Sequence, residues 1–562
     1  MKGTDMELLS KAKNPAFWKD VREKDCYKSY REMLLDAWET FGDNMPIPPL
    51  YYQDFRLFET TGDRAKFEKP CFDRRRALNC AAMLSLIYPD EEKYFLRLMD
   101  MIFATCSEYT WAHPAHLMHI KDDERVRIEL FAAETGFYLS EIYTLLGDRL
   151  DARIRKLIED ELERRIFAPY RSVSVYYWEN CTNNWAAVCV GSVAASFMLM
   201  KPDEAKTLIP RFEKTMKNFL SGFTDDGVCL EGHGYWNYGF GYFMVYADFI
   251  RLFTDGKIDH FKNEKVKRIS LGYQELYLNG KVAVTFSDGR VPFTFVESRM
   301  HYLKNEYPNE IRLFEKSMIT RDISKFSSLL REAIWYSEKY AAAEVTTPTS
   351  DFFAPYSEWF VSHKNAYAFA AKGGHNDEPH NHNDVGSFIY AKDGKHILTD
   401  LGSGLYTRQY FSDERYSIIE ASSRGHSVPI IDGGYQLPGK EYKARNSRFE
   451  NGTFSSDIAL AYGLYEEESI QRSFTLDEKG VTLIDRFALR DRSVMERIVT
   501  LYEPKMEKDG VILIEDARIA YDPALWEYSL HTEKKTTVGE ETAYLLDFTP
   551  KGKATEFVLR ME

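Results

Sequence analysis

The sequence predicts an α+β protein with a helical N-terminal part followed by a β-rich C-terminal part. Up to about residue 340, apolar residues recur at every third or fourth position, as in amphipathic helices. Beyond about residue 358, short alternating runs separated by Asp-Gly and Lys-Gly turns dominate, as in antiparallel sheets. The stretch 341–358 between them is rich in Thr, Pro and Ala and predicts a linker. We therefore expect a helical domain at 1–345 and an antiparallel β-sandwich at 346–562.

The helical pattern is strongest in four stretches, at 80–109, 127–147, 184–200 and 241–255. The stretch 184–200, NWAAVCVGSVAASFMLM, is almost wholly apolar and small, which predicts an inner helix buried on most sides. The loops between the stretches are short and carry Gly, Pro or Asp. Because the sequence has no strict repeat, we expect paired helices packed in layers or closed into a ring, and no solenoid of identical units.

The strand pattern is clearest at 366–372, 386–402, 469–489 and 555–561. The tetrapeptide KDGK (392–395) and the tripeptide EKG (478–480) are typical of hairpin turns. These runs therefore predict antiparallel pairs within the β-sandwich.

Composition excludes some classes of function and compartment. The net charge of −14 argues against a nucleic-acid-binding protein, although a basic cleft for an anionic substrate remains compatible with it. The seven cysteines include no CxxC pair, which predicts free thiols. The sequence has no run of 18 apolar residues, so we expect no membrane span. The first residues lack the apolar core of a signal peptide, so we expect a cytoplasmic protein, or a secreted or periplasmic one whose signal was removed.

The segment 373–434 is the most informative part of the sequence. His375, His380 and His382 lie close together beside Asp384, and Asp400 and His426 follow at the end of a predicted strand and in a turn. Imidazoles and a carboxylate on separate strands can meet across adjacent edges, and such a set suits Zn²⁺. The alternative is a polar loop that only caps hairpins. The density of His, Asn and Asp next to Gly favours a functional site over such a loop.

A second cluster, YYWENCTNNWAAV (176–188), lies in the helical part. Asn183 and Asn184 stand just before the predicted inner helix, and either could cap it. Only one cap is needed, however, and the flanking Trp178 and Trp185 suit a cleft that binds sugars.

A third cluster, DDGVCLEGHGYWNYGFGYF, covers 225–243. Four of its residues recur at helical spacing and would share one face: Glu231, Tyr235, Tyr238 and Tyr242. The simplest interpretation is aromatic packing, but the Gly-rich surroundings and His233 favour a face open to a ligand. A weaker cluster at 110–119 contains three histidines: His113, His116 and His119.

Together, the motifs NNWAAV, EGHGYWNYG, HNHNDVGSF, TDLGSGLY and SSRGHSVPIIDG resemble the heparinase II/III-like polysaccharide lyases, a family that includes several alginate lyases. The motifs cover roughly residues 175 to 435, and the helical-then-β order agrees over the whole chain. The resemblance implies an incomplete (α/α) toroid followed by a C-terminal antiparallel β-sandwich, with the active cleft between them. It also implies cleavage of uronic-acid-containing glycans by β-elimination, which leaves an unsaturated uronate product.

The same resemblance implies roles for individual residues. β-Elimination needs donors that neutralise the uronate carboxylate, a base for the C5 proton and an acid for the leaving oxygen. Asn184, with Asn183 beside it, matches the residue that grips the carboxylate, although some relatives carry His there. His380 matches the histidine that faces the substrate as neutraliser or base. The catalytic tyrosine belongs to EGHGYWNYG, where spacing from Asn184 favours Tyr238 over Tyr235.

The resemblance also implies a structural Zn²⁺ held by His382, Asp400 and His426. His380 and His382 would alternate along an extended strand and point to the same face. We expect the partner to be an anionic uronate-containing polysaccharide or oligosaccharide. The chain could also form a homo-oligomer. The candidate substrate-binding residues are Asn183, Trp185, Glu231, His116 and Trp178.

Two other classes of function compete with a lyase. A glycoside hydrolase on an (α/α) toroid needs two carboxylates across a cleft. Glu231 with Asp225 or Asp226 could supply them, but the His-rich segment offers no convincing acid partner. A non-catalytic carbohydrate-binding protein is disfavoured by the full set of Asn, Tyr and His candidates.

Overall fold

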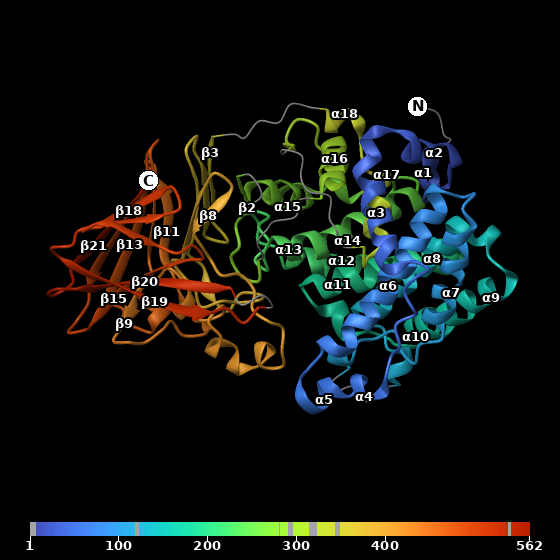
Figure 1. Ribbon diagram of the computed structural model, residues 1–562, viewed down its shortest axis with the longest axis horizontal. Coiled ribbons are helices and arrows are strands. Elements are labelled where there is room, and N and C mark those ends of the chain that lie inside the picture. The colour runs from blue at the N-terminus through green and yellow to red at the C-terminus, as the bar shows by residue number, and fades with distance from the viewer. Residues whose placement is uncertain are drawn as a thin grey trace. The chain divides into compact units, whose positions relative to one another are not determined.

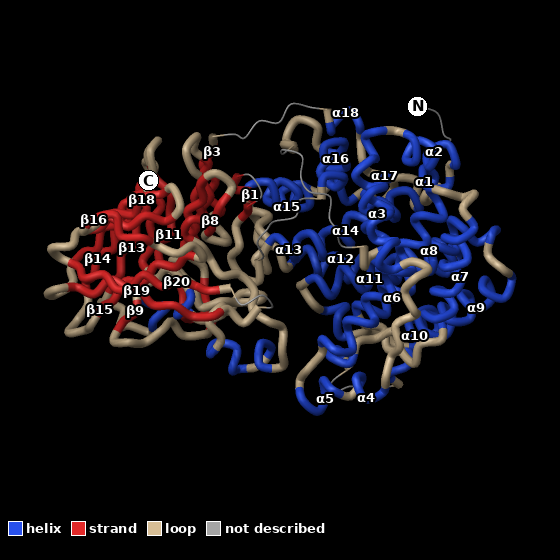
Figure 2. The backbone as a smooth tube through the Cα atoms, viewed as in Figure 1, coloured by secondary structure: helices blue, strands red, loops and turns tan. Residues whose placement is uncertain are grey.

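The computed structural model describes residues 7–117, 123–279, 282–289, 296–313, 323–342, 349–537 and 541–562. The chain divides into two compact units. The helical unit comprises Met1–Gly222, Asn237–Lys267 and Thr294–Glu344, and the β unit comprises Phe223–Trp236, Arg268–Phe293 and Val345–Glu562. Figures 1 and 2 show that helices dominate the first unit and strands the second. The expected boundary at 345–346 lies outside the described residues, and two earlier segments also belong to the β unit.

The helical unit contains most of the helices that the structure describes. Its described helices are α1 (Ser10–Lys13), α2 (Pro15–Glu23), α3 (Lys28–Phe41), α4 (Tyr52–Phe55), α5 (Leu57–Thr61), α6 (Ala65–Ile87), α7 (Glu92–Cys106), α8 (Leu130–Leu146), α9 (Ala152–Leu162), α10 (Ala168–Ser172), α11 (Asn184–Met200), α12 (Pro202–Ser221), α14 (Gly241–Phe253), α16 (Glu297–Glu306), α17 (Phe326–Ile334) and α18 (Glu338–Ala341). Helix α15 (Glu264–Glu275) starts in this unit and ends in the β unit. The short α13 (His233–Tyr235) belongs to the β unit, and a π-helical turn follows it at Trp236–Phe240.

Helix α11 is the inner helix of this unit, as its sequence predicts. Its N-cap is Asn183, whose side-chain oxygen accepts a hydrogen bond from the Trp185 backbone N–H at 3.2 Å. Its side chains are almost all buried, and it packs against α8, α12 and α14. Pro202 then starts α12, where a missing N–H costs nothing.

The described residues of the β unit form three larger antiparallel sheets. One has five strands, in the order β3 (Ser350–Ala354), β4 (Trp359–His363), β5 (Ala368–Lys372), β7 (Phe388–Lys392) and β8 (Lys395–Leu398). The eight-stranded sheet has the order β11 (Arg445–Glu450), β12 (Thr453–Asp457), β13 (Ser469–Leu476), β14 (Val481–Ala488), β21 (Glu556–Met561), β18 (Ala517–Tyr521), β17 (Val511–Ile514) and β16 (Lys505–Lys508). The four-stranded sheet has the order β19 (Trp526–Lys534), β20 (Thr542–Pro550), β15 (Val494–Thr500) and β9 (Ile430–Ile431). Two small sheets pair β1 (Tyr277–Asn279) with β2 (Val282–Ala283) and β6 (His375–Asn376) with β10 (Gly439–Lys443).

The five-stranded and eight-stranded sheets pack face to face around an aromatic core. The rings of Phe360 and Phe454 lie 5.5 Å apart, and those of Phe369 and Phe474 lie 5.0 Å apart. These contacts form the antiparallel β-sandwich that the sequence predicts. The predicted KDGK hairpin joins β7 to β8, with Asp393 at φ 47° and Gly394 at φ 74°, as a two-residue turn of this kind requires.

The other face of the five-stranded sheet is covered by chain from the two earlier segments of the β unit. Val228, Val282 and Phe286 from those segments pack against Trp359 and Val361 of β4. This packing explains why residues 223–236 and 268–289 belong to the β unit. It also brings those residues to the sheet that leads into the His-rich segment.

Two expectations about the region before residue 358 need correction. Strands β1 and β2 interrupt the part that we expected to be wholly helical. Strand β3 begins inside the expected linker 341–358 because its residues pair with β4 from Ser350↔His363 onward. Residues 343–348 of that linker lie outside the described part of the chain.

Candidate active site and metal group

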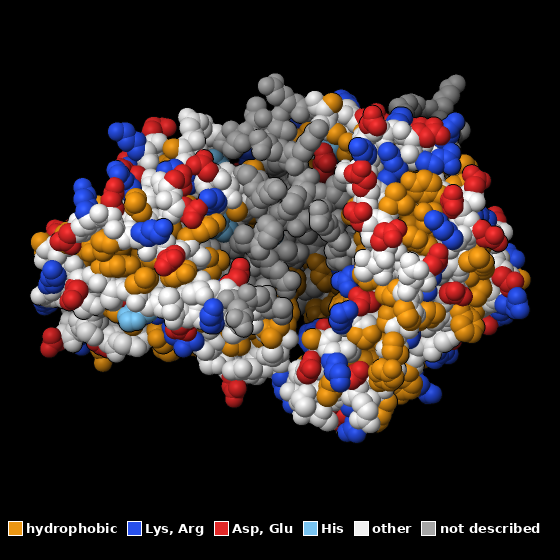
Figure 3. All heavy atoms as spheres, viewed as in Figure 1, with side chains coloured by type: hydrophobic (Ala, Val, Ile, Leu, Met, Phe, Trp, Pro, Cys, Tyr) orange, Lys and Arg blue, Asp and Glu red, His pale blue; other side chains and the backbone are white. Residues whose placement is uncertain are grey.

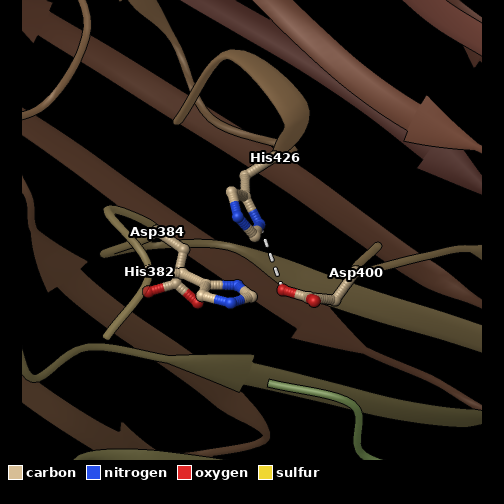
Figure 4. Close-up of side chains that lie close together, drawn as sticks. All are labelled: His382, Asp384, Asp400 and His426. Atoms are coloured by element: carbon tan, nitrogen blue, oxygen red, sulfur yellow. Dashed lines mark ion pairs between the residues drawn. The ribbon is translucent and has the colours of Figure 1, made fainter. Parts of the chain in front are cut away.

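Among the described residues, one group of His, Cys, Asp or Glu side chains could hold a metal ion. It consists of His382, Asp384, Asp400 and His426, whose candidate ligand atoms all lie within 4.8 Å of one another. All four side chains are buried and converge on one space (Figure 4). The three expected ligands are therefore together, and Asp384 is a fourth member that the sequence did not single out as a ligand.

The hydrogen bonding of this group fits a cation. Four buried atoms of the group have no hydrogen-bond partner among the described residues: His382 Nδ1, Asp384 Oδ2, Asp400 Oδ2 and His426 Nδ1. His426 Nδ1 and Asp400 Oδ2 lie 3.0 Å apart as an ion pair, without the alignment of a hydrogen bond. Buried polar atoms are almost always partnered, so four unpartnered ones around one space match the donor set of a metal ion. Burial raises the pKa of Asp400, but His426 and His382 outweigh burial and hold that pKa below its ordinary value.

The protein also holds the second polar atom of each side chain in the group. These contacts are Asp384 Oδ1 with Lys372 Nζ at 2.7 Å, Asp400 Oδ1 with the Gly402 N–H at 2.7 Å, His426 Nε2 with the Glu420 carbonyl oxygen at 2.9 Å, and His382 Nε2 with Asp288 Oδ1 at 3.1 Å. Such contacts fix the orientation of metal ligands.

His380 and Tyr235 form a stacked pair within the β unit. Their ring centroids lie 4.1 Å apart with an interplanar angle of 27°. His380 Nδ1 contacts Asp288 Oδ2 at 2.6 Å, and His380 Nε2 lies 3.5 Å from Glu231 Oε2. The Tyr235 hydroxyl lies 2.8 Å from that of Tyr406. Because the side chains of both His380 and Tyr235 are only partly buried, an imidazole and a phenol stand together at an accessible place.

Asp288 is the buried carboxylate beneath this pair. Burial raises the pKa of Asp288, but the hydrogen bonds from His380 and His382 outweigh burial and hold that pKa far below its ordinary value. The side chain is therefore ionised, and a negative charge lies between the stacked pair and the metal group.

The expectation that His380 and His382 alternate along an extended strand is wrong. The chain turns at these residues, and His380 has a left-handed φ of 56°. Both imidazoles instead reach the same carboxylate, that of Asp288, through different ring nitrogens.

Tyr235 belongs to the β unit and Tyr238 to the helical unit. A π-helical turn at Trp236–Phe240 follows α13 and changes the helical register, so the expectation of one continuous face from Glu231 to Tyr242 is wrong. Tyr238 is half-buried, with Lys325 Nζ 4.2 Å from its ring centroid. Burial raises the pKa of Tyr238 well above its ordinary value.

The start of α11 separates the two expected asparagines. Asn183 caps the helix, whereas Asn184 is buried beneath Gly239, where an added Cβ would lie 3.0 Å from the Asn184 Cβ. The next residue, Trp185, is half-buried, and its ring lies 4.9 Å from His116. These residues form a polar and aromatic group within the helical unit.

His116 is backed by a buried carboxylate. Its Nδ1 contacts Glu129 Oε2 at 2.5 Å, and Glu129 Oε1 accepts the Ala132 N–H in the first turn of α8. His119, from the same sequence cluster, lies outside the described residues.

Trp178 is a core residue, which corrects its expected place in a sugar cleft. Its side chain is fully buried, its Nε1 donates to the Ile128 carbonyl oxygen at 3.1 Å, and its ring stacks on Tyr176 at 5.0 Å. Neither face of the ring is left for a sugar.

The molecular surface carries both signs of charge. On the coloured part of the face in Figure 3, Lys and Arg side chains are interspersed with Asp and Glu. Among the described residues, no helix has both the length and the apolar character needed to cross a membrane.

Comparisons with known proteins find likeness in structure. No family model and no curated protein matches the sequence. A heparan sulfate lyase mutant from Pedobacter heparinus is 16% identical, with a TM-score of 0.61 over 98% of this chain and 86% of that chain. A heparinase III is 13% identical, with a TM-score of 0.59 over 94% of this chain and 83% of that chain.

A more distant structure agrees with these two. A mutant chondroitin AC lyase from Streptomyces coelicolor A3 is 9% identical, with a TM-score of 0.54 over 98% of this chain and 82% of that chain. At these identities the likeness concerns the fold. The chain therefore has the fold of the heparinase-like lyases, an (α/α) toroid with an antiparallel β-sandwich.

Proposed function

We propose that the protein is a polysaccharide or oligosaccharide lyase that cleaves uronic-acid-containing glycans by β-elimination. The observation that carries the proposal is the stacked and partly exposed pair of Tyr235 and His380 above a buried carboxylate. The fold supports it, because the similar structures are named as a heparinase III, a heparan sulfate lyase and a chondroitin AC lyase. The proposed partner is an anionic glycan of this class.

The chemistry of β-elimination gives each residue a task. The C5 proton of the uronate is removed, the electron pair forms the C4–C5 double bond, and the C4–O4 bond breaks as the leaving oxygen takes up a proton. Tyr235 is the proposed proton-transferring group. His380 is the proposed neutraliser or base. Asn184 is the proposed donor to the carboxylate, whose charge must be balanced while C5 is deprotonated.

Tyr235 now takes precedence over Tyr238, which the spacing from Asn184 favoured. The Tyr235 hydroxyl belongs to a hydrogen-bonded chain with Tyr406, and its ring stacks on the proposed catalytic histidine. Tyr238 has Lys325 over its ring and a desolvated hydroxyl. A phenol that must exchange protons with a substrate is better served by the first environment.

The metal that best suits the buried group is Zn²⁺ in a structural role. Imidazole nitrogen and carboxylate oxygen are usual zinc ligands, and four protein ligands leave no position for a substrate. His382, Asp384, Asp400 and His426 would hold the ion, which would tie their loops together. The metal content of the purified protein, measured by mass spectrometry, tests this assignment; a preparation that neither contains nor binds zinc contradicts it.

The substrate assay separates the proposed function from its alternatives. The protein is incubated with heparan sulfate, chondroitin sulfate, hyaluronan and alginate oligosaccharides, and the ultraviolet absorbance of the unsaturated uronate is followed. A lyase produces this absorbance with at least one of them. New reducing ends without the absorbance would indicate a hydrolase, and binding without any product would indicate a carbohydrate-binding protein.

The hydrolase alternative has weak support from its candidate carboxylates. Asp226 Oδ2 accepts the backbone N–H groups of Tyr356 at 2.9 Å and Ser357 at 3.0 Å, and its other oxygen accepts the N–H of Val228 at 3.3 Å. A carboxylate engaged in this way holds a turn. It is poorly placed to serve as the acid or base of glycoside hydrolysis.

We predict that replacing Tyr235 with Phe lowers kcat by about 10²–10⁴-fold, because the variant loses the proton-transferring hydroxyl and keeps the stacked ring. Replacing Tyr238 with Phe removes a hydroxyl of the same type in the same motif and should change kcat far less. Steady-state rates on the best substrate and circular dichroism of both variants provide the measurement. The reverse ranking of the two variants would return the role to Tyr238.

We also propose a reducing compartment such as the cytoplasm. All seven cysteines are free, and five of them are buried. Free thiols persist where glutathione and thioredoxin keep them reduced. Fractionation of the source cells checks this location, and recovery of the protein outside the cytoplasm contradicts it.

A further inference from the structure

Asp288 is a carboxylate of the β unit that is hydrogen-bonded to several side chains of the proposed site. It lies on Arg268–Phe293, about 90 residues before the His-rich segment, and is almost completely buried. We propose that Asp288 is a positioning residue that fixes, with one carboxylate, the ring nitrogens presented by both His380 and His382. The inference rests on the proposed function for the role of His380, whereas the role toward His382 concerns the metal group alone.

Among the residues that the structure describes, five side chains contact the Asp288 carboxylate. Oδ2 contacts His380 Nδ1 at 2.6 Å and accepts from the Tyr406 hydroxyl at 2.8 Å. Oδ1 contacts His382 Nε2 at 3.1 Å and accepts from the Tyr410 hydroxyl at 2.5 Å and Arg415 Nη2 at 3.2 Å. An ionised carboxylate only accepts hydrogen bonds, so each of these partners must direct a hydrogen toward it.

For His382, this contact settles which nitrogen is available to a metal. Nε2 carries the hydrogen that faces Asp288, so in the neutral ring Nδ1 has the free lone pair. His382 Nδ1 is buried, has no hydrogen-bond partner in the described part of the chain, and belongs to the metal group. A carboxylate behind a metal-binding imidazole both orients it and makes it more basic.

For His380, the same carboxylate leaves the lone pair on the other ring nitrogen, Nε2. Nδ1 carries the hydrogen toward Asp288, so the neutral ring presents the lone pair of Nε2 away from it. The left-handed backbone at His380 is held by Arg415, whose Nη2 donates to the His380 carbonyl oxygen at 3.1 Å and also to Asp288. Asp288 therefore acts on the backbone turn as well as on the ring.

Asp288 also reaches the proposed proton-transferring phenol. The Tyr406 hydroxyl that donates to Asp288 Oδ2 lies 2.8 Å from the Tyr235 hydroxyl. Because the single hydroxyl hydrogen of Tyr406 is given to Asp288, Tyr406 accepts the hydrogen of Tyr235. One carboxylate thus orders the imidazole, the phenol and a metal ligand.

The experiment replaces Asp288 with Asn. The amide of Asp288→Asn keeps the shape but offers one accepting oxygen and one donating NH₂ group, so it cannot serve both histidines in their present tautomers. We expect kcat on the best uronate substrate to fall by about 10²-fold or more with little change in KM, because orientation of the reacting groups is lost. We expect the affinity for Zn²⁺, measured by competition with a chromophoric chelator, to fall by about 10–100-fold.

Two further variants keep the test decisive. Asp413→Asn removes an exposed carboxylate from the same unit and should match the wild type in both measurements. Asp288→Glu keeps the charge but carries the carboxylate one methylene further, so it should recover only part of the zinc affinity and of kcat. If circular dichroism finds Asp288→Asn unfolded, Asp288→Glu takes its place, and wild-type values in both measurements then overturn the proposal.

The two parts of the proposal fail in different ways. Wild-type zinc affinity in folded Asp288→Asn overturns the role toward His382, and wild-type kcat overturns the role toward His380. If the wild-type protein itself has no lyase activity, the proposed function fails. In that case a 10–100-fold loss of zinc affinity still supports Asp288 as the residue that orients the metal ligand.

Discussion

Lys372 is the buried cation beside the metal group. Its Nζ donates to Asp384 Oδ1 at 2.7 Å and to Glu378 Oε2 at 3.2 Å, and all three side chains are almost inaccessible. Burial lowers the pKa of Lys372, but the two carboxylates outweigh it and raise that pKa, so the ammonium stays charged. Burial raises the pKa of Glu378 to about 7. Lys372 therefore balances a carboxylate that the metal group needs ionised.

We predict that Lys372→Met destabilises the protein by roughly 3–5 kcal/mol, because it leaves Asp384 and Glu378 buried without their cation. Chemical denaturation followed by tryptophan fluorescence measures this loss. Lys395→Met, on the exposed end of β8, is the matched control and should behave as the wild type. A Lys372→Met variant as stable as the control would contradict the proposed role of this ammonium.

Around Asp288, the sequence could predict the metal-binding residues but not Asp288 itself. His382, Asp400 and His426 were predicted, because an HxH pattern and two further motifs fit a known ligand set. Asp288 stands in an ordinary Asp-Gly turn sequence, and only folding brings it to the histidines. No local pattern signals a contact across about 90 residues.

Helix α11 is the element on which sequence and structure agree most closely. It starts at Asn184 and ends at Met200, the bounds of the predicted apolar run, because an Asn precedes the run and a proline follows it. The hairpin of β13 and β14 was equally predictable, since two alternating runs flank a turn sequence. Local signals that agree with burial are sufficient for such elements.

The segment from Glu231 to Tyr242 could not be predicted in the same way. A helical spacing of four residues suggested one face, but the π-helical turn at Trp236–Phe240 inserts an extra residue into the register. This turn carries Gly239, which allows close approach to Asn184. Periodicity alone does not reveal a π-helical turn.

Substitutions of the two asparagines at the start of α11 should have different effects, one on stability and the other on activity. We predict that Asn183→Ala lowers the unfolding free energy by about 1 kcal/mol, because the Trp185 N–H loses its cap. Asn184→Ala should act mainly on kcat, because the proposed donor to the uronate carboxylate is lost. Denaturation midpoints and steady-state rates of both variants provide the measurement. A kcat unchanged in Asn184→Ala would remove this residue from the proposed mechanism.

At the scale of the whole molecule, the metal group joins separate parts of the β unit. His382 and Asp384 lie between β6 and β7, Asp400 follows β8, and His426 precedes β9. All four residues belong to the β unit, as do the neighbouring Tyr235 and Asp288. The two-part order of the fold was predictable from hydrophobic periodicity. The inclusion of residues 223–236 and 268–289 in the β unit was not, because it depends on apolar packing against the five-stranded sheet.

Because all four metal-group residues lie in the β unit, removal of the metal should destabilise that unit and not the helical one. An ion that binds only the folded β unit stabilises it by about 4 kcal/mol at a free concentration 1,000 times its dissociation constant. Treatment with a strong chelator should therefore speed hydrogen exchange in residues 373–434, where the ligand loops lie, and leave α11 of the helical unit protected. Exchange measured by mass spectrometry with and without added Zn²⁺ tests this, and Asp400→Asn should reproduce the effect of the chelator without one. Equal loss of protection in both units would mean that the metal stabilises the whole molecule, and an unchanged pattern would mean that the four side chains hold their loops together without an ion.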